Sequence, residues 1–210
     1  VITLEVTSGT MRLGNGTNSH CVLGSTGTAG RVYTNMLKKV EIGNGVLDIG
    51  NYAFYTCHSL TSITIPKSVE SISAGTFQEG YSLTSITIPS GVQNIGNHSF
   101  YYGYALASIT IPNSVQSISD NALYACRSLA SITIPSSVTN IGAAAFYTCR
   151  SLASITIPSS VTNISDAAFY ACSGVAHYYV YPTTPPALGG ESFASIPSDC
   201  TIHVPAVALD

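Results

Sequence analysis

The chain repeats one unit of 23 residues without a gap, and this repeat limits the possible folds more than any other feature of the sequence. Residues 151–164 are identical to residues 128–141. A leucine opens each of six consecutive units, at Leu37, Leu60, Leu83, Leu106, Leu129 and Leu152. A fixed period of roughly 20 to 50 residues is typical of a solenoid, in which each coil covers the apolar edge of the next.

Each unit keeps its large apolar residues at fixed places. The unit that opens at Leu129 has them at Leu129, Ile132, Ile134, Val138, Ile141 and Phe146. Polar and β-branched residues alternate over 131–134, which predicts a short strand with both isoleucines pointing inward, and Pro135 ends that strand. Val138 and Ile141 predict a second extended segment. We interpret residues 143–149 as a helical or 3₁₀ turn.

The pattern L-x-x-I-x-I-P-x-x-V-x-x-I-x-x-x-A-F-x-x-C resembles the BspA-type leucine-rich repeats of bacterial surface proteins. It runs from Leu37 to about Gly174, and the tail from Tyr181 through Pro205 resembles the end of such arrays in gut Bacteroidetes, the Bacteroides type. We therefore predict a leucine-rich repeat solenoid that is right-handed and curved. It is expected to contain mostly parallel β-structure with short helical or 3₁₀ turns.

Three segments make up one elongated domain in this interpretation. Residues 1–36 do not fit the period and are predicted to form an N-terminal cap, with an alternating strand over 2–6 and a turn at 14–16. Residues 37–174 are six full repeats. Residues 175–210 are predicted to form a degenerate repeat and a C-terminal cap, in which Tyr178 and Val180 replace the strand isoleucines.

Composition and charge exclude several classes of partner. Only 8% of the residues are charged, the net charge is -3, and seven Lys and Arg residues are spread over the whole chain, so binding to nucleic acid is not expected. No apolar run approaches the roughly 18 residues that span a bilayer. The chain begins at Val1 without a signal segment. Localisation at the cell surface or secretion is therefore an expectation that rests on the resemblance. We expect a monomer.

The cysteines follow the repeat and do not form a metal-binding motif. Four of the six, Cys57, Cys126, Cys149 and Cys172, share one place in the unit. No C-x-x-C motif or neighbouring histidine supports a metal site, which favours small buried side chains. A strained disulfide between two of Cys126, Cys149 and Cys172 remains an alternative. We expect neither a cofactor nor a metal ion.

The sequence offers no convincing catalytic group. Asp120 and Asp166 share a place two coils apart, about 10 Å at strand spacing, which is near the separation of an inverting glycosidase pair. An aspartate at the start of a turn is more typical of a cap. His177 and His203 fall on neighbouring strands and should both point outward, but no third metal ligand is evident. We therefore predict that the protein is not an enzyme.

Two surface rows are candidates for binding. The first is a row of hydroxyl groups on the outward face of the predicted strands, in which each threonine follows a serine by two residues: Thr64, Thr87, Thr110, Thr133 and Thr156. The second is aromatic, formed by Tyr55, Tyr101, Tyr124, Tyr147 and Tyr170, and beside it lie Arg127 and Arg150. Both rows also have a structural explanation, because Ser and Thr suit exposed strands and a tyrosine ring can simply pack along the edge of a coil.

The resemblance implies a non-enzymatic scaffold that adheres to a host extracellular or cell-surface protein, or to other cells, through one of these rows. One alternative is a glycan-binding module for polysaccharide capture. The other is a structural spacer that presents a different domain.

Overall fold

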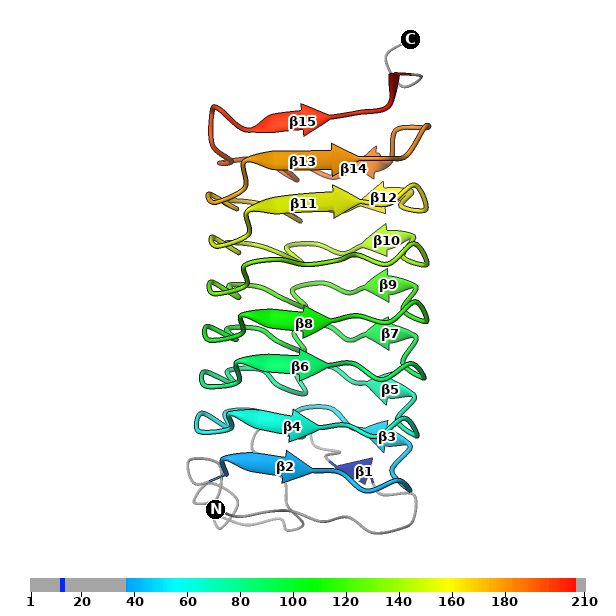
Figure 1. Ribbon diagram of the computed structural model, residues 1–210, viewed down its shortest axis with the longest axis vertical. Coiled ribbons are helices and arrows are strands. Elements are labelled where there is room, and N and C mark those ends of the chain that lie inside the picture. Colours follow the sequence, from blue (N-terminus) through cyan, green and yellow to red (C-terminus); the bar gives the residue numbers. More distant parts are fainter. Residues whose placement is uncertain (1–11, 14–36, 207–210) are drawn as a thin grey trace.

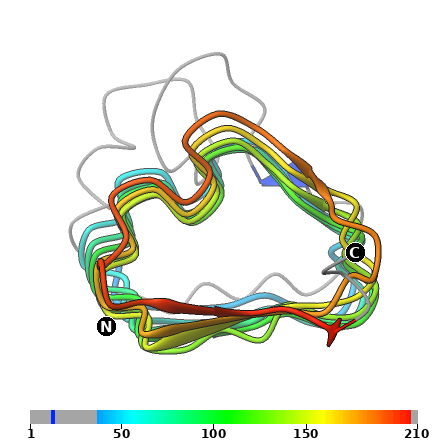
Figure 2. The same ribbon diagram turned by 90° about the horizontal axis from the view of Figure 1, so that it is seen from above.

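The computed structural model describes residues 12–13 and 37–206, and in it the chain winds into a parallel β-solenoid of about 7 turns with about 23 residues per turn. The predicted N-terminal strand over 2–6 and turn at 14–16 lie outside the described residues. The chain runs along the front of the molecule, returns along the rear and climbs by one coil each time, so the coil is right-handed (Figures 1 and 2).

Short parallel strands form the front and rear faces. The front strands are β2 (Lys39–Glu41), β4 (Ser62–Thr64), β6 (Ser85–Thr87), β8 (Ser108–Thr110), β11 (Ser154–Ile157), β13 (His177–Val180) and β15 (Thr201–His203). They pair as β2-β4, β6-β8 and β11-β13-β15. The predicted strand over 131–134 is not a strand in the structure, although Ile132 and Ile134 are buried as expected.

The rear sheet is continuous and has eight strands. Its members are β1 (Arg12–Leu13), β3 (Asp48–Ile49), β5 (Ser71–Ile72), β7 (Asn94–Ile95), β9 (Ser117–Ile118), β10 (Asn140–Ile141), β12 (Asn163–Ile164) and β14 (Ala187–Leu188). Most adjacent strands pair at an offset of 23 residues, so that Ile141 lies beside Ile118 and Ile164. This sheet confirms the second extended segment of the repeat.

The core is a column of apolar rows between the two sheets. Phenylalanine rings stack from coil to coil, with ring centroids 5.4 Å apart for Phe54–Phe77 and 5.2 Å apart for Phe146–Phe169. Leu123 takes the place of phenylalanine in its coil and is fully buried. Burial of about 1.5 to 3 kcal/mol per large side chain, repeated in every coil, stabilises the array through neighbour contacts.

The predicted helical or 3₁₀ turn at the end of each unit is wrong, because no residue between 37 and 205 is helical. Successive backbone amide groups in these turns alternate between a hydrogen bond within the turn and a hydrogen bond to the next coil. Those of Ala53 and Tyr55 bond a carbonyl three residues back, whereas those of Phe54 and Thr56 bond carbonyls of the next coil. Since a helix would use every amide locally, the bonds between coils exclude it. The backbone instead has positive φ at Tyr52 (58°) and Thr56 (57°).

The coils stack into a nearly straight column, without the curvature we predicted (Figure 1). A helix has a diameter of about 10 Å or more and would hold neighbouring coils further apart on its side than strands at about 4.8 Å. Hydrogen bonds between coils follow the front sheet, the rear sheet and the turns alike. The rise is therefore the same on every side, and nothing bends the column.

The side chains of Cys126, Cys149 and Cys172 are buried, as expected for small core residues. Cys126, Cys149 and Cys172 are free thiols, and each Sγ donates a hydrogen bond to a carbonyl of the preceding coil at 3.3, 3.2 and 3.1 Å respectively. Burial raises the pKa of Cys126 and of Cys172 to about 12, and it raises that of Cys149 well above the ordinary 9.0.

Candidate binding surface

A column of stacked tyrosines runs along one edge of the solenoid. We call Tyr101, Tyr124, Tyr147 and Tyr170 the tyrosine column; their ring centroids are 4.7, 4.6 and 4.8 Å apart in order along the chain. Each follows a core residue of the turn, such as Phe146 before Tyr147, so the backbone points one side chain inward and the next outward. The rings are half-buried.

Stacking decides what the tyrosine column can present to a partner. Each inner ring has a neighbouring ring on both faces, which leaves its edge and its hydroxyl group for contacts from outside. Burial and the neighbouring tyrosines raise the pKa values of Tyr101 and Tyr124 above the ordinary 10.0, so both phenols stay neutral and can donate hydrogen bonds at physiological pH. Tyr55 is separated from the column by Gln78, and its hydroxyl donates to Glu79 at 3.4 Å.

A second row beside the tyrosine column ends in two arginines. The rings of His58 and Tyr81 stack at 4.5 Å, Tyr81 and Tyr104 stack at 5.3 Å, and the guanidinium of Arg127 lies over Tyr104, 5.0 Å from the ring centroid. Arg150 occupies the same place one coil further on. Both arginines are exposed, and within the described residues the ion pair Lys39–Glu41 involves neither of them.

The front face carries the predicted hydroxyl rows. All five threonines and the five serines two residues before them are exposed, and none makes a side-chain hydrogen bond to another described residue. Serines at the turns behave differently, since Ser137 and Ser160 each donate to a carbonyl of the preceding coil at 2.6 Å. The hydroxyl rows are therefore free to bind solvent or a ligand.

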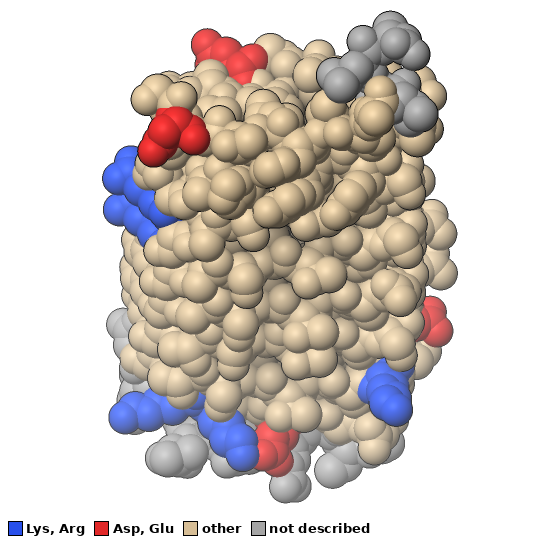
Figure 3. Space-filling view, turned by 45° about the horizontal axis from the view of Figure 1, so that its top comes forward, with Lys and Arg blue, Asp and Glu red and all other residues tan. Residues whose placement is uncertain are grey.

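A shallow groove crosses the front face near its N-terminal end. Its volume is about 580 Å³, and its polar lining includes Ser62, Thr64, Ser85, Thr87 and Lys67. Charged side chains are sparse over the face that Figure 3 shows and lie near its margins. The groove thus combines uncharged hydroxyl groups and a single lining cation with apolar residues such as Ile65, Ile88 and Pro112.

The aspartates suspected as a catalytic pair are caps, as their positions predict. An Oδ1 atom of Asp120 accepts the amide of Ala143 at 2.8 Å, and that of Asp166 accepts the amide of Gly190 at 2.7 Å. Each carboxylate therefore fixes the start of the turn in the next coil. In the part of the chain that the structure describes, no three His, Cys, Asp or Glu residues are grouped so as to hold a metal ion.

Sequence reasoning missed two features of these faces. The sequence predicted that His177 and His203 lie on neighbouring strands, but it did not predict contact between their rings. In the structure the two rings lie within hydrogen-bonding distance of each other. Sequence reasoning also overlooked Tyr179, whose ring stacks on His203 at 4.6 Å. Tyr179 pairs with His203 at an offset of 24 residues, one more than the repeat, and this offset was the signal that could have placed the two rings together.

Comparison with known proteins identifies the repeat class. The family described as "BspA type Leucine rich repeat region" matches residues 32–134 and 93–206, with six copies of the repeat. No curated protein matches the chain. Among the described residues, no helix is long and apolar enough to cross a membrane.

Solved structures show the same fold. The Treponema pallidum leucine-rich repeat protein is 29% identical with a TM-score of 0.70, over 78% of this chain and 80% of that chain. A leucine-rich repeat protein from Bacteroides ovatus is 20% identical with a TM-score of 0.53, over 98% of this chain and 70% of that one. A leucine-rich cell surface protein from Faecalibacterium prausnitzii is 24% identical with a TM-score of 0.51, over 83% and 62% respectively.

Proposed function

The chain belongs to the BspA-type leucine-rich repeat family, and we propose on that basis that it is a non-enzymatic adhesive module that binds a protein of a host or of another cell. It acts as a monomer at the bacterial cell surface or after secretion. The description of the similar Faecalibacterium prausnitzii protein as a cell surface protein supports this location.

The observation that carries the proposal is the pair of exposed arginines beside the tyrosine column. Arg127 and Arg150 are exposed and occupy adjacent coils, whose backbones lie about 4.8 Å apart along the axis, so they concentrate positive charge at one place on this edge. A guanidinium binds a carboxylate through two parallel hydrogen bonds. Tyr and Arg are also the residue types that most often dominate binding energy at protein interfaces.

The stacking of the tyrosine column favours a protein partner over a glycan on this edge. A sugar ring packs on the face of an aromatic ring, and the inner faces of the column are occupied by neighbouring tyrosines. Ring edges and neutral hydroxyl groups instead suit the backbone carbonyls and side chains of a polypeptide. The partner surface therefore carries carboxylates opposite the arginines and hydrogen-bond acceptors opposite the tyrosines.

Polysaccharide capture is a second candidate function, and it rests on a different face. The groove over Ser62, Thr64, Ser85 and Thr87 offers hydroxyl groups that make no hydrogen bond to another described residue, and they can exchange hydrogen bonds with sugar hydroxyls. Lys67 at the rim would favour an acidic sugar.

An array of extracellular-matrix proteins and glycans tests both candidates. The purified chain is applied at physiological salt, together with the double variant R127A/R150A and the single variant K67A, which removes one positive charge from the front face. Saturable binding to a protein that R127A/R150A loses and K67A keeps supports adhesion through this edge. Glycan binding lost in K67A supports the second candidate, and the absence of any binding favours a spacer.

A further inference from the structure

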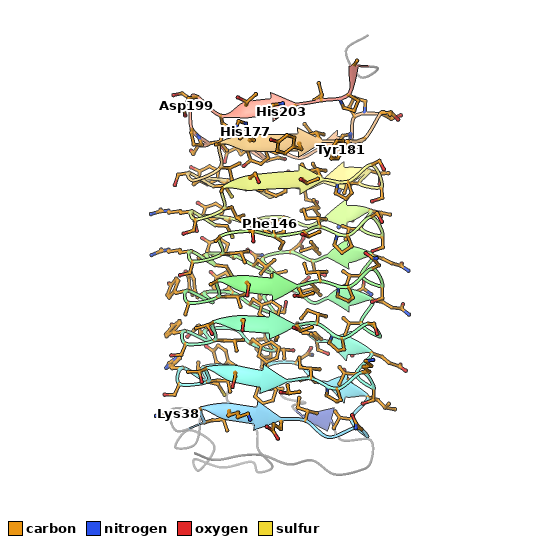
Figure 4. The ribbon with its side chains drawn as sticks, viewed as in Figure 1. Lys38, Phe146, His177, Tyr181, Asp199 and His203 are labelled. Atoms are coloured by element: carbon orange, nitrogen blue, oxygen red, sulfur yellow. The ribbon has the colours of Figure 1, made fainter. Side chains whose placement is uncertain are left out.

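Two histidines meet at the C-terminal end of the front face. His177 lies on β13 and His203 on β15, and the Nε2 atom of His203 is 3.2 Å from the Nδ1 atom of His177. Both side chains are exposed. Figure 4 shows them one coil apart on the outer side of the two strands, away from Asp199 before β15 and Tyr181 at the far end of β13.

The register of the two strands brings the rings together. His177 pairs with Thr201 and Tyr179 pairs with His203, so the two histidines are diagonal neighbours on the same face of the sheet. Long side chains in diagonal places of paired strands can touch. The ring of Tyr179 stacks on His203 with an interplanar angle of 11°, and this contact restricts the orientation of the His203 ring.

We propose that His177 and His203 form a binding site for a divalent transition-metal ion, with Nδ1 of His177 and Nε2 of His203 as ligands and water in the remaining positions. Metal–nitrogen bonds are about 2.0 to 2.1 Å long. Two such ligands are roughly 2.9 Å apart at a right angle and roughly 3.3 Å apart at the tetrahedral angle, so the observed 3.2 Å fits this range, and metal binding requires the rings to turn their nitrogen lone pairs toward a shared point. Imidazole ligands suit Zn²⁺, Cu²⁺ and Ni²⁺.

The site differs from every other histidine in the described part of the chain. His58 stacks on Tyr81, and His98 lies against Tyr101 with the ring centroids 5.2 Å apart, so each is next to an aromatic ring and not to a second imidazole. Only at the last two front strands do two ring nitrogens converge from outward-facing places. The site is independent of the arginines and the tyrosine column.

Calorimetric titration of the chain without a polyhistidine tag, with CuCl₂ and with ZnCl₂ in a buffer that does not bind metals, tests the assignment. We expect a saturable site in the wild-type protein, and we expect H177Q and H203Q each to weaken binding by about tenfold or more. The control H98Q removes a remote imidazole and should bind as the wild type does. Cu²⁺ should bind more tightly than Zn²⁺.

Thermal unfolding gives a second readout that does not depend on calorimetric heat. Bound metal should raise the Tm of the wild type and of H98Q and leave that of H177Q and H203Q unchanged, because only a ligand that binds the folded state stabilises it. Both substitutions lie on exposed side chains, so all variants should fold, and circular dichroism checks this. Saturable binding that survives both substitutions, or no binding in the wild type, would overturn the assignment and leave the contact as a hydrogen bond between two imidazoles.

Discussion

The tyrosine column and the front hydroxyl rows repeat with the same period on the same coils, yet their side chains behave in opposite ways. The tyrosine rings contact one another at 4.6 to 4.8 Å between centroids. The serine and threonine hydroxyls of the front face make no hydrogen bond to another described residue. A coil rise of about 4.8 Å fits stacked aromatic rings but exceeds the 2.5 to 3.0 Å of a hydroxyl hydrogen bond.

The rise therefore decides which side chains can contact the equivalent side chain of the next coil, whereas the turn serines bridge coils by bonding to backbone carbonyls. Rings stack, and amides are long enough to bridge adjacent coils, since Nδ2 of Asn163 donates to Oδ1 of Asn140 at 2.6 Å. The short hydroxyl groups on the front strands do not reach the equivalent hydroxyl groups of the next coil. The same repeat thus builds one row that stabilises the fold as well as offering an edge for binding, and another row that contributes little to stability.

The largest effect is expected in the core, which sets the scale for both rows. Phe146→Ala removes a ring that is fully buried and stacked on Phe169. We expect the free energy of unfolding to fall by about 3 to 5 kcal/mol, measured by urea denaturation. A loss below about 1 kcal/mol would mean that the coils do not depend on their phenylalanine row.

The next effect tests whether the tyrosine column is structural. Tyr147→Ala removes two stacked contacts, to Tyr124 and Tyr170, at about 0.5 to 1.5 kcal/mol each. We expect a total loss of about 1 to 3 kcal/mol, whereas the control Tyr147→Phe keeps the ring and should have nearly wild-type stability. Equal losses in the two variants would assign the effect to the hydroxyl group and contradict the stacking account.

The third prediction concerns how the stability of the fold depends on pH through the buried thiol of Cys126. The pKa of Cys126 is raised from the ordinary 9.0 to about 12 in the folded state. The folded state therefore favours the neutral thiol, so its contribution is complete below about pH 9 and is lost as the pH rises toward 12. At pH 10.5 the loss is about 2 kcal/mol for this thiol. Urea denaturation at pH 8 and pH 10.5 should show a smaller alkaline loss in Cys126→Ala than in the wild type, and equal losses would refute this linkage.

The smallest effect is expected on the front face. Thr133→Val removes an exposed hydroxyl that makes no hydrogen bond to another described residue and keeps the β-branched shape, so stability should change by no more than about 0.5 kcal/mol. Differential scanning calorimetry of the single variant and of T110V/T133V/T156V measures this. A loss of several degrees in Tm would reveal a hydroxyl network that the structure lacks.

The period of the sequence was enough to predict the solenoid, its two extended segments and the inward-facing residues, because the rows of Ile, Val, Leu and Phe mark the core directly. The turns were predicted wrongly. The segment Ala143-Ala144-Ala145-Phe146 has high local helix propensity, but its alternate amides bond the next coil. A local sequence pattern does not show that hydrogen bonds to the next coil compete with those of a helix. Because no helix forms in these turns, the curvature that we predicted is also absent.

For the candidate binding surface, the sequence predicted which residues share a row but not which side chains contact each other. The period assigns each tyrosine and arginine to its row, and the structure adds the stacking of Tyr124 on Tyr147 and the placement of Arg127 over Tyr104. Those contacts depend on side-chain rotamers, which a period does not specify. His177 and His203 were placed correctly on neighbouring strands, both pointing outward, but their contact was missed because it depends on the rotamers of two diagonal side chains.

We propose that the arginines and the tyrosine column form the binding edge and that the hydroxyl rows do not. The most direct test is the Kd of the tightest protein partner from the array for two matched sets of variants, Y124F/Y147F/R150Q on the edge and T110V/T133V/T156V on the front face. We expect a loss of affinity of about a hundredfold, roughly 3 kcal/mol, for the edge variant and a change below about twofold for the front-face variant. The reverse order, with binding lost in the front-face variant and kept in the edge variant, would contradict it.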